Sequence, residues 1–214
     1  MESDLAALAA QVNTLTPDLN VGSATLAAPG ALEVAVEGLK PGAVVYPVFM
    51  ANGWFVRSQL PRRLARDDLR ITTPLGLEPG LPALAQVMIT VAIGKAGWRT
   101  EDVSVLIAGH GSARTNYAAE ATYAFSDALA PLLPACSLSV GFVEQTPTIA
   151  EAAVDLGPQT ICLPFLARRG GHYREDVFEE LANAGFRGEI LDVIGNFPGI
   201  PALIAGRLNK ECKP

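Results

Sequence analysis

The sequence predicts an α/β protein made of two tandem flavodoxin-like lobes with parallel sheets, in which the N-terminal lobe lacks its first strand. Two observations carry this prediction. Short β-branched runs alternate with helical patterns along the chain, and the second half of the chain repeats the first. Half of the 214 residues are hydrophobic and 18% are charged, a composition that can bury a sizeable core and that excludes disorder.

Two pairs of segments show the repeat. Residues 47–64 align without a gap with residues 164–181, at an offset of 117. Residues 75–84 align with residues 194–203 at an offset of 119, and both segments end in Pro-Gly-x-Pro-Ala-Leu. The change of offset corresponds to one loop insertion, so both pairs belong to a single duplication.

The second half of the chain contains the complete set of elements, and we place its lobe at residues 98–214. The expected elements alternate in strand–helix order, which is typical of a parallel sheet covered by helices. The expected strands are residues 103–108, 137–143, 160–165 and 189–193, and the expected helices are residues 116–133, 149–156, 174–184 and a last one from Pro201.

The first half, residues 1–97, begins differently. Residues 5–12 already have the pattern of the long first helix, so the strand and loop that precede this helix in the second half are missing. Because the first strand of such a sheet lies in its interior, its loss leaves backbone groups unpaired. We expect residues 23–26 to pair directly with residues 43–48 in a three-stranded sheet; the alternatives are a segment from a second molecule or a strand upstream of Met1.

Charge and composition exclude several classes of protein. A net charge of -6 argues against general nucleic-acid binding, which relies on a basic face. The longest apolar stretch, around residues 81–93, is too short for a membrane span, and a signal peptide is not visible, so we expect a cytoplasmic protein. The three cysteines lack the spacing of a metal site, and Cys162 is expected to be a buried small hydrophobe.

Both histidines of the chain follow predicted strands within glycine-rich loops. His110 follows the first strand of the second half, Glu144 the second strand and His172 the third. Ligands of open α/β sheets bind beyond the carboxyl ends of the strands, so we expect the two imidazoles to face one another within about 10 Å. Neutral imidazole binds divalent transition metals and also accepts protons near neutral pH. The alternative is an ordinary surface or capping role for each histidine.

Three motifs follow in order along the second half: residues 105–114 (VLIAGHGSAR), 141–149 (GFVEQTPTI) and 163–177 (LPFLARRGGHYREDV). They resemble the H-G-S-R type loop, the strand ending in glutamate and the P-x-x-L-x-x-G-x-H segment of the sirohydrochlorin chelatases, the class II tetrapyrrole chelatases of CbiX type. The similarity covers about residues 103–203. It implies a chelatase-like fold with a tetrapyrrole cleft between two lobes.

The resemblance also implies roles for individual residues. His110 and His172 would bind the metal and accept protons, with Glu144 assisting. The residues that would meet substrate carboxylates or let the substrate approach are Ser112, Arg114, Arg168, Arg169, Gly170, Gly171 and Arg174. A structural ion pair is the alternative for Arg174.

The first half has lost the metal-binding residues. Phe55 aligns with His172, and His110 has no counterpart. Trp54 and Phe55 are expected to form the opposite wall of the cleft, with filling of the core as the alternative. The helix expected next carries four arginines, which either form a solvated helix face or attract a polycarboxylate substrate. They are Arg57, Arg62, Arg63 and Arg66.

The resemblance implies insertion of a divalent metal ion (Co²⁺, Fe²⁺ or Ni²⁺) into sirohydrochlorin or a related uroporphyrinoid, by a monomer or weak homodimer without an organic cofactor. A non-catalytic tetrapyrrole- or metal-binding protein derived from a chelatase is the main alternative. A histidine-dependent hydrolase is weaker, because Ser112 lacks an acidic residue to orient a His110 base.

Overall fold

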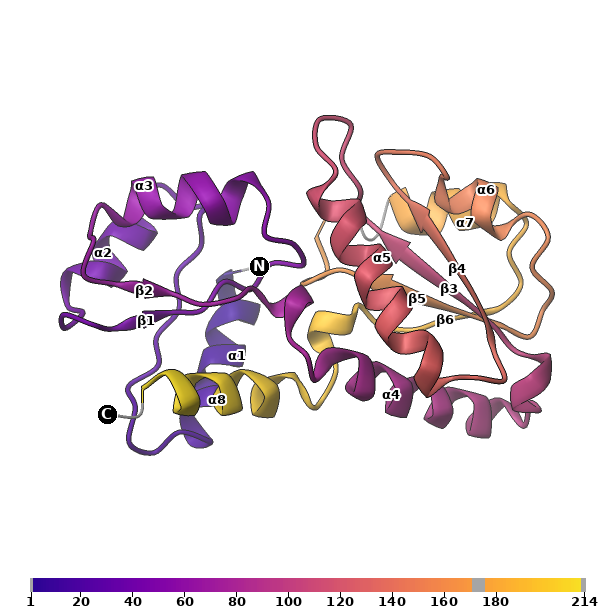
Figure 1. Cartoon of the computed structure of the whole chain (residues 1–214), viewed down its shortest axis with the longest axis horizontal. Helices are drawn as coiled ribbons and strands as arrows, with labels where there is room; N and C mark the ends of the chain where they lie inside the picture. Colours follow the sequence, from indigo (N-terminus) through magenta and orange to yellow (C-terminus); the bar gives the residue numbers. More distant parts are fainter. Residues whose placement is uncertain (1, 171–175, 213–214) are drawn as a thin grey trace.

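The structure, a computed structural model, describes residues 2–170 and 176–212 of the chain. Two bodies lie side by side, one around a four-stranded sheet and one around a two-stranded sheet (Figure 1). We call residues 81–199 the larger lobe, and residues 2–80 together with 200–212 the smaller lobe. No helix in the described part of the chain is long and apolar enough to cross a membrane.

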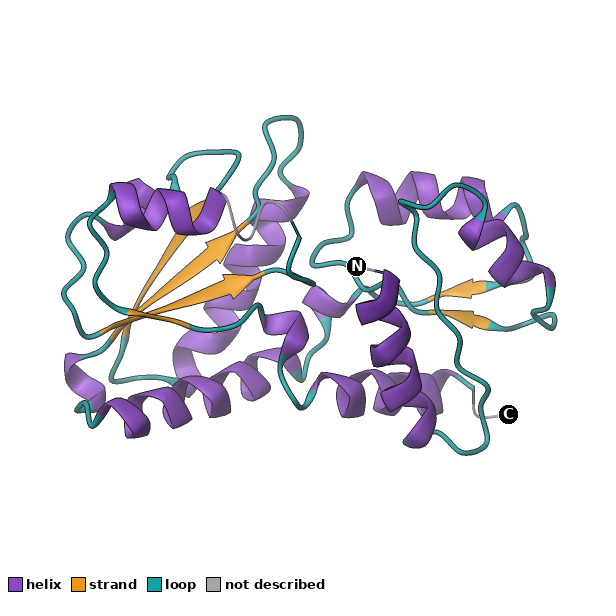
Figure 2. Cartoon of the chain, turned by 180° about the vertical axis from the view of Figure 1, so that it is seen from behind, coloured by secondary structure: helices purple, strands orange, loops and turns teal. Residues whose placement is uncertain are grey.

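The larger lobe is built on a parallel sheet with the strand order β4-β3-β5-β6, which is the expected flavodoxin-like arrangement. The strands are β3 (Ser104–Gly109), β4 (Ser137–Phe142), β5 (Thr160–Phe165) and β6 (Glu189–Ile190). The central strands β3 and β5 are buried almost throughout, because helices cover both faces of the sheet (Figure 2).

Alternate residues of the central strands enter different cores. Val105 and Ile107 face the core of α4 (Leu81–Ala96) and α5 (Tyr117–Leu129). Leu106 and Cys162 face the core of the opposite layer, formed by α6 (Ile149–Ala153) and α7 (Phe178–Asn183). Cys162 is fully buried, as expected for a small core residue, and burial raises the pKa of its thiol to about 12.

The smaller lobe contains only two short strands, and they are parallel. Its elements in chain order are α1 (Glu2–Thr14), α2 (Ala31–Glu37), β1 (Val44–Val45), the π-helical turn η1 (Phe55–Gln59), α3 (Leu60–Leu64), β2 (Arg70–Ile71) and the short turn η2 (Leu75–Leu77), followed at the end of the chain by α8 (Ile200–Glu211).

The prediction of a three-stranded sheet in the smaller lobe is wrong. Residues 23–26 form no strand, and residues 44–45 pair with 70–71 instead. The reason lies in the larger lobe, where β4 bonds only to β3. Without a counterpart of β3, the counterpart of β4 has no neighbour with which to pair. Ala24 and Leu26 still pack against the core of the smaller lobe.

The two sheets share one pairing register. Val44 opposes Arg70 in the smaller lobe, and Ile161 opposes Glu189 in the larger lobe. These are the same positions under the sequence offsets of 117 and 119. The aligned glycines Gly76 and Gly195 also play one role. A Cβ on Gly76 would lie 1.9 Å from the carbonyl oxygen of Met50, after β1, and one on Gly195 would lie 1.9 Å from that of Ala167, after β5.

The last helix of each sequence half packs on the lobe of the other half. Helix α4 belongs to residues 1–97 but packs against α5, whereas α8 packs along α1 (Figure 1). The two helix starts meet reciprocally, with Gly80 against Leu203 and Gly199 against Leu84. A Cβ at Gly80 would lie 2.7 Å from Leu203 Cδ1, and one at Gly199 would lie 2.5 Å from Leu84 Cδ1, so glycine permits this close approach.

Candidate functional site

The carboxyl ends of β3 and β4 place His110 and Glu144 on neighbouring loops. The backbone N–H of Glu144 donates to the carbonyl of His110 at 2.9 Å, which continues the strand pairing one step into the loops. Gly109 and Gly111 flank the histidine in a tight environment. A Cβ on Gly109 would lie 2.8 Å from Thr122 Oγ1, and Gly111 has a φ of +71°, which favours glycine.

The side chains of this pair also lie together. His110 Nδ1 is 3.8 Å from Glu144 Oε2, and the two side chains are 38% and 45% exposed. At this distance the two groups lie close together without forming a hydrogen bond. Because β3 and β4 are neighbouring parallel strands, the loops at their carboxyl ends bring these two side chains together. The arrangement offers an imidazole and a carboxylate to solvent, which are suitable ligands for a divalent metal and acceptors for a proton.

Gln145 is a residue of this loop pair that sequence reasoning missed. Its side-chain oxygen accepts the Ser112 N–H at 2.9 Å, and its side chain packs against Gly111. It therefore fixes the His110 loop to the Glu144 loop. Its position directly after Glu144 was the only sequence signal.

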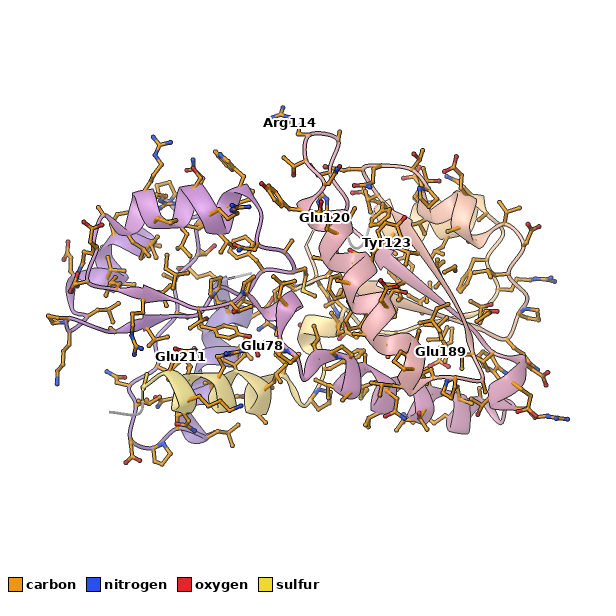
Figure 3. All side chains as sticks on the ribbon, in the orientation of Figure 1. Glu78, Arg114, Glu120, Tyr123, Glu189 and Glu211 are labelled. Carbon is orange, nitrogen blue, oxygen red and sulfur yellow. The ribbon has the colours of Figure 1, made fainter. Side chains whose placement is uncertain are left out.

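Ser112 and Arg114 lie farther along the loop that begins at His110 and take part in other contacts. The Ser112 hydroxyl accepts the N–H groups of Arg114 at 3.2 Å and of Thr115 at 3.3 Å, so it shapes the turn of the loop. Arg114 lies at the tip of the loop between β3 and α5 and points away from the body of the protein (Figure 3).

Arg168 and Arg169 reach toward the loop after β6, on the side of β5 opposite to β3. Arg169 forms two hydrogen bonds with Asp192, at 2.7 and 2.6 Å. Burial disfavours the Asp192 carboxylate, yet hydrogen bonds from Arg169, Asn196 and the Val193 N–H outweigh it and hold the pKa of Asp192 below its ordinary value.

Arg168 is only partly satisfied. Its Nη1 donates to Asn196 Oδ1 at 2.8 Å, whereas its buried Nε and Nη2 have no hydrogen-bond partner among the described residues. Burial lowers the pKa of Arg168, although Asp4 and Asp192 oppose this shift.

His172 lies outside the described residues, as do Gly171 and Arg174. The predicted approach of His110 to His172 therefore stays a prediction. Gly170 is described: its N–H donates to the carbonyl of Arg168, and a Cβ on it would meet no atom of the described residues within 4 Å. Among the described residues, no three histidine, cysteine or acidic side chains gather to hold a metal ion.

Trp54 and Phe55 are 54% and 52% exposed, so the alternative that they fill the core is wrong. Their rings meet edge to face at a centroid distance of 5.1 Å, and Phe55 stacks on Phe49 at 6.0 Å. Their segment touches the larger lobe at Tyr117, since a Cβ on Gly53 would lie 3.9 Å from Tyr117 Cβ. Both aromatic side chains therefore lie at the surface, on a segment that contacts the start of α5 at Gly53.

Two arginines of the smaller lobe have structural partners. Arg63 forms an ion pair with Glu33 at 2.9 Å and donates to the carbonyl of Leu26. Arg66 forms an ion pair with Asp68 at 2.6 Å and donates to the carbonyls of Val36 and Leu39. Of the four arginines, Arg57 and Arg62 therefore remain candidates for attracting a polycarboxylate substrate.

Comparison with solved structures identifies three informative matches. CbiX, described as the terminal enzyme for siroheme biosynthesis in denitrifying bacteria, shares 40% identity over 100% of this chain and 92% of its own, with a TM-score of 0.90. SirB from Bacillus subtilis with Fe³⁺ shares 16% identity over 99% of this chain and 90% of its own, with a TM-score of 0.70. SirB from Bacillus subtilis subspecies spizizenii in complex with cobalt shares 14% identity over 98% and 88%, with a TM-score of 0.68.

Among curated protein sequences, no match was found. The sequence pattern of the CbiX family matches residues 104–211, which include β3 with its histidine loop and the strands that follow. This match and the full-length similarity at 40% identity agree with the motifs around His110 and Glu144. The chain belongs to the CbiX family.

Proposed function

We propose that this protein inserts a divalent metal ion into sirohydrochlorin or a related uroporphyrinoid, in siroheme or cobalamin biosynthesis. The metal, Co²⁺, Fe²⁺ or Ni²⁺, is a substrate. The observation that carries the proposal is the His110–Glu144 pair at 3.8 Å, on the loops after β3 and β4 of a CbiX-family chain. The relative that supports it is described as an enzyme of siroheme biosynthesis, and the SirB structures hold Fe³⁺ or cobalt.

The reaction exchanges two pyrrole N–H protons of the macrocycle for one metal ion. It needs a site that holds the ion weakly enough to release it, together with bases that take up the protons. Imidazole serves both purposes. We assign metal binding and proton acceptance to His110 and His172, and transfer of the ion or of a proton to Glu144.

The two repeats and the loops around this site have different parts in the reaction. Residues 98–214 form the catalytic repeat and residues 1–97 a degenerate repeat, whose Trp54 and Phe55 cover the macrocycle. Carboxylates of the substrate meet the loops that follow β3 and β5, whose proposed contact residues are Ser112, Arg114, Arg168, Arg169, Gly170, Gly171 and Arg174. The protein acts in the cytoplasm as a monomer or weak homodimer, without an organic cofactor, nucleic acid or membrane.

The test is to mix purified protein with sirohydrochlorin and each metal ion in turn and to follow the absorption spectrum of the macrocycle. We expect insertion above the rate without protein, and a loss of about 100-fold or more in His110→Ala, in the range of general acid–base catalysis. Thr115→Ala, an exposed change in the same loop, is the matched control. Binding of sirohydrochlorin without insertion of any of the metals would instead favour the non-catalytic binding protein.

A further inference from the structure

One cation–π contact joins the two lobes beside the candidate site. The Arg57 guanidinium of the smaller lobe lies over the Tyr117 ring, 5.0 Å from its centroid. Tyr117 is the first residue of α5, the helix that follows the His110 loop. The segment between β1 and α3 runs toward this helix start (Figure 1). Arg57 is therefore held on the same side of the molecule as the loop that carries His110.

Arg57, in η1, differs from Arg63 and Arg66, which follow it along the chain. Arg63 and Arg66 are engaged with carboxylates and backbone carbonyls. Arg57 is exposed, and within the described part of the chain it has neither an ion pair nor a hydrogen bond. A cation–π contact uses the charge of the guanidinium but not its N–H groups. The donors of Arg57 thus remain available, while Tyr117 restricts where the group can lie.

The neighbours of Arg57 suit one class of ligand. Trp54 and Phe55, at the start of the same segment η1, expose about half of their surfaces. Flat aromatic rings beside a positioned guanidinium match a flat conjugated molecule that carries carboxylates on its rim. A uroporphyrinoid has this chemistry. A simple carboxylate would use the arginine but not the aromatic surface.

We propose that Arg57 binds one rim carboxylate of the tetrapyrrole and so positions the macrocycle between Trp54 and Phe55 of the smaller lobe and His110 of the larger lobe. This inference rests on the proposed function and deepens it. Arg57 is then a positioning residue for the substrate, contributed by the repeat that has lost the metal-binding histidines.

The test measures binding of uroporphyrin III, a stable octacarboxylate, by quenching of tryptophan fluorescence. The background is Trp98→Phe, in which Trp54 is the remaining tryptophan. We expect Arg57→Ala to raise the Kd about 10-fold, as for loss of a charge-assisted hydrogen bond, and Arg57→Lys to restore only part of the affinity. Arg62→Ala, which removes the same charge from an exposed site of the adjoining helix, should change the Kd less than about 2-fold.

Equal weakening by Arg57→Ala and Arg62→Ala would overturn the inference, because it would show general charge attraction. An unchanged Kd in Arg57→Ala would also overturn it. If Arg57→Ala lowers the thermal midpoint, Arg57→Gln decides, since it keeps the side chain as far as Cδ and a polar end group but removes the charge. Metal insertion by the unaltered protein distinguishes failure of the proposed function from failure of the Arg57 proposal. If the unaltered protein inserts no metal, the proposed function is refuted. If it inserts metal normally and the Arg57 variants bind uroporphyrin III unchanged, only the role of Arg57 is refuted.

Discussion

In the larger lobe, Phe197 is buried in the main apolar core, and Met88 of α4 packs against the same core. The aligned positions of the smaller lobe hold Glu78 and Arg207. Glu78 is only 5% exposed, and both of its carboxylate oxygens accept hydrogen bonds from Arg207, at 3.0 and 3.1 Å. Figure 3 shows Glu78 beside α8, near the junction of the lobes.

The difference shows that the same backbone arrangement can be stabilised by apolar packing or by an ion pair. The two solutions differ in how strongly they depend on the partner side chain. Apolar packing tolerates imperfect geometry, whereas a buried carboxylate is stable only if its partner is present. Glu78 therefore makes the smaller lobe, with its two-stranded sheet, depend on correct docking of α8. A third aligned pair continues the contrast: Leu163 is apolar in the larger lobe, and Tyr46 brings a buried hydroxyl into the smaller one.

The sharpest test of this comparison is Glu78→Leu. It removes both hydrogen bonds to Glu78 and leaves Arg207 with the 3.6 Å ion pair to Glu211, and we expect a loss of about 3 kcal/mol in the free energy of unfolding, measured by urea titration. The double variant Glu78→Phe/Arg207→Met copies the larger lobe and should recover most of this loss. A double variant as unstable as Glu78→Leu would show that apolar side chains cannot replace the ion pair in the smaller lobe.

The next test exchanges the histidine between the repeats. His172→Phe gives the larger lobe the residue that the smaller lobe has at the aligned position, and we expect metal insertion to fall about 100-fold. Tetrapyrrole binding should persist, because aromatic contact remains possible. The reverse change, Phe55→His, should not restore insertion to that variant, since the smaller lobe has no counterpart of His110. Restoration in the doubly exchanged protein would contradict the assignment of the two repeats.

A smaller effect is expected from Phe55→Ala. Loss of one aromatic contact should raise the Kd for uroporphyrin III about 3- to 10-fold, by fluorescence titration. The thermal midpoint should barely change, because Phe55 is half exposed. Tyr123→Ala serves as the comparison on the larger lobe: this residue packs edge-on against Phe142, so its replacement should lower stability more than it weakens binding.

The smallest expected effect concerns Tyr46, whose buried hydroxyl lies close to the carboxylate of Glu78 but makes no hydrogen bond of good geometry to the described residues. Burial, reinforced by the negative charge of Glu78, raises the pKa of Tyr46. Tyr46→Phe should stabilise the protein by about 1 kcal/mol at pH 7. Since the unfolded tyrosine ionises near pH 10 and the folded one does not, the native protein loses stability as the pH rises above about 10. Tyr46→Phe should lose less over that window, and equal slopes for both proteins would contradict this account.

The sequence predicted the larger lobe well because each of its strands is an apolar run followed by a polar loop. The same logic brought His110 and Glu144 together. It failed for residues 23–26, since strand formation there depends on a neighbour that the sequence of the segment does not reveal. The partners of Arg168 and Arg169 also escaped prediction, because Asp192 and Asn196 come from a separate strand end.

The exchange of α4 and α8 sets an order in which the chain can be completed during synthesis. The described elements of the larger lobe all lie before residue 200, so its sheet and both helical layers precede α8 along the chain. The smaller lobe begins at Glu2 but includes residues 200–212, among them Arg207. The part of the protein that is made first is therefore the last to close, and until α8 emerges the carboxylate of Glu78 waits without its counter-ion.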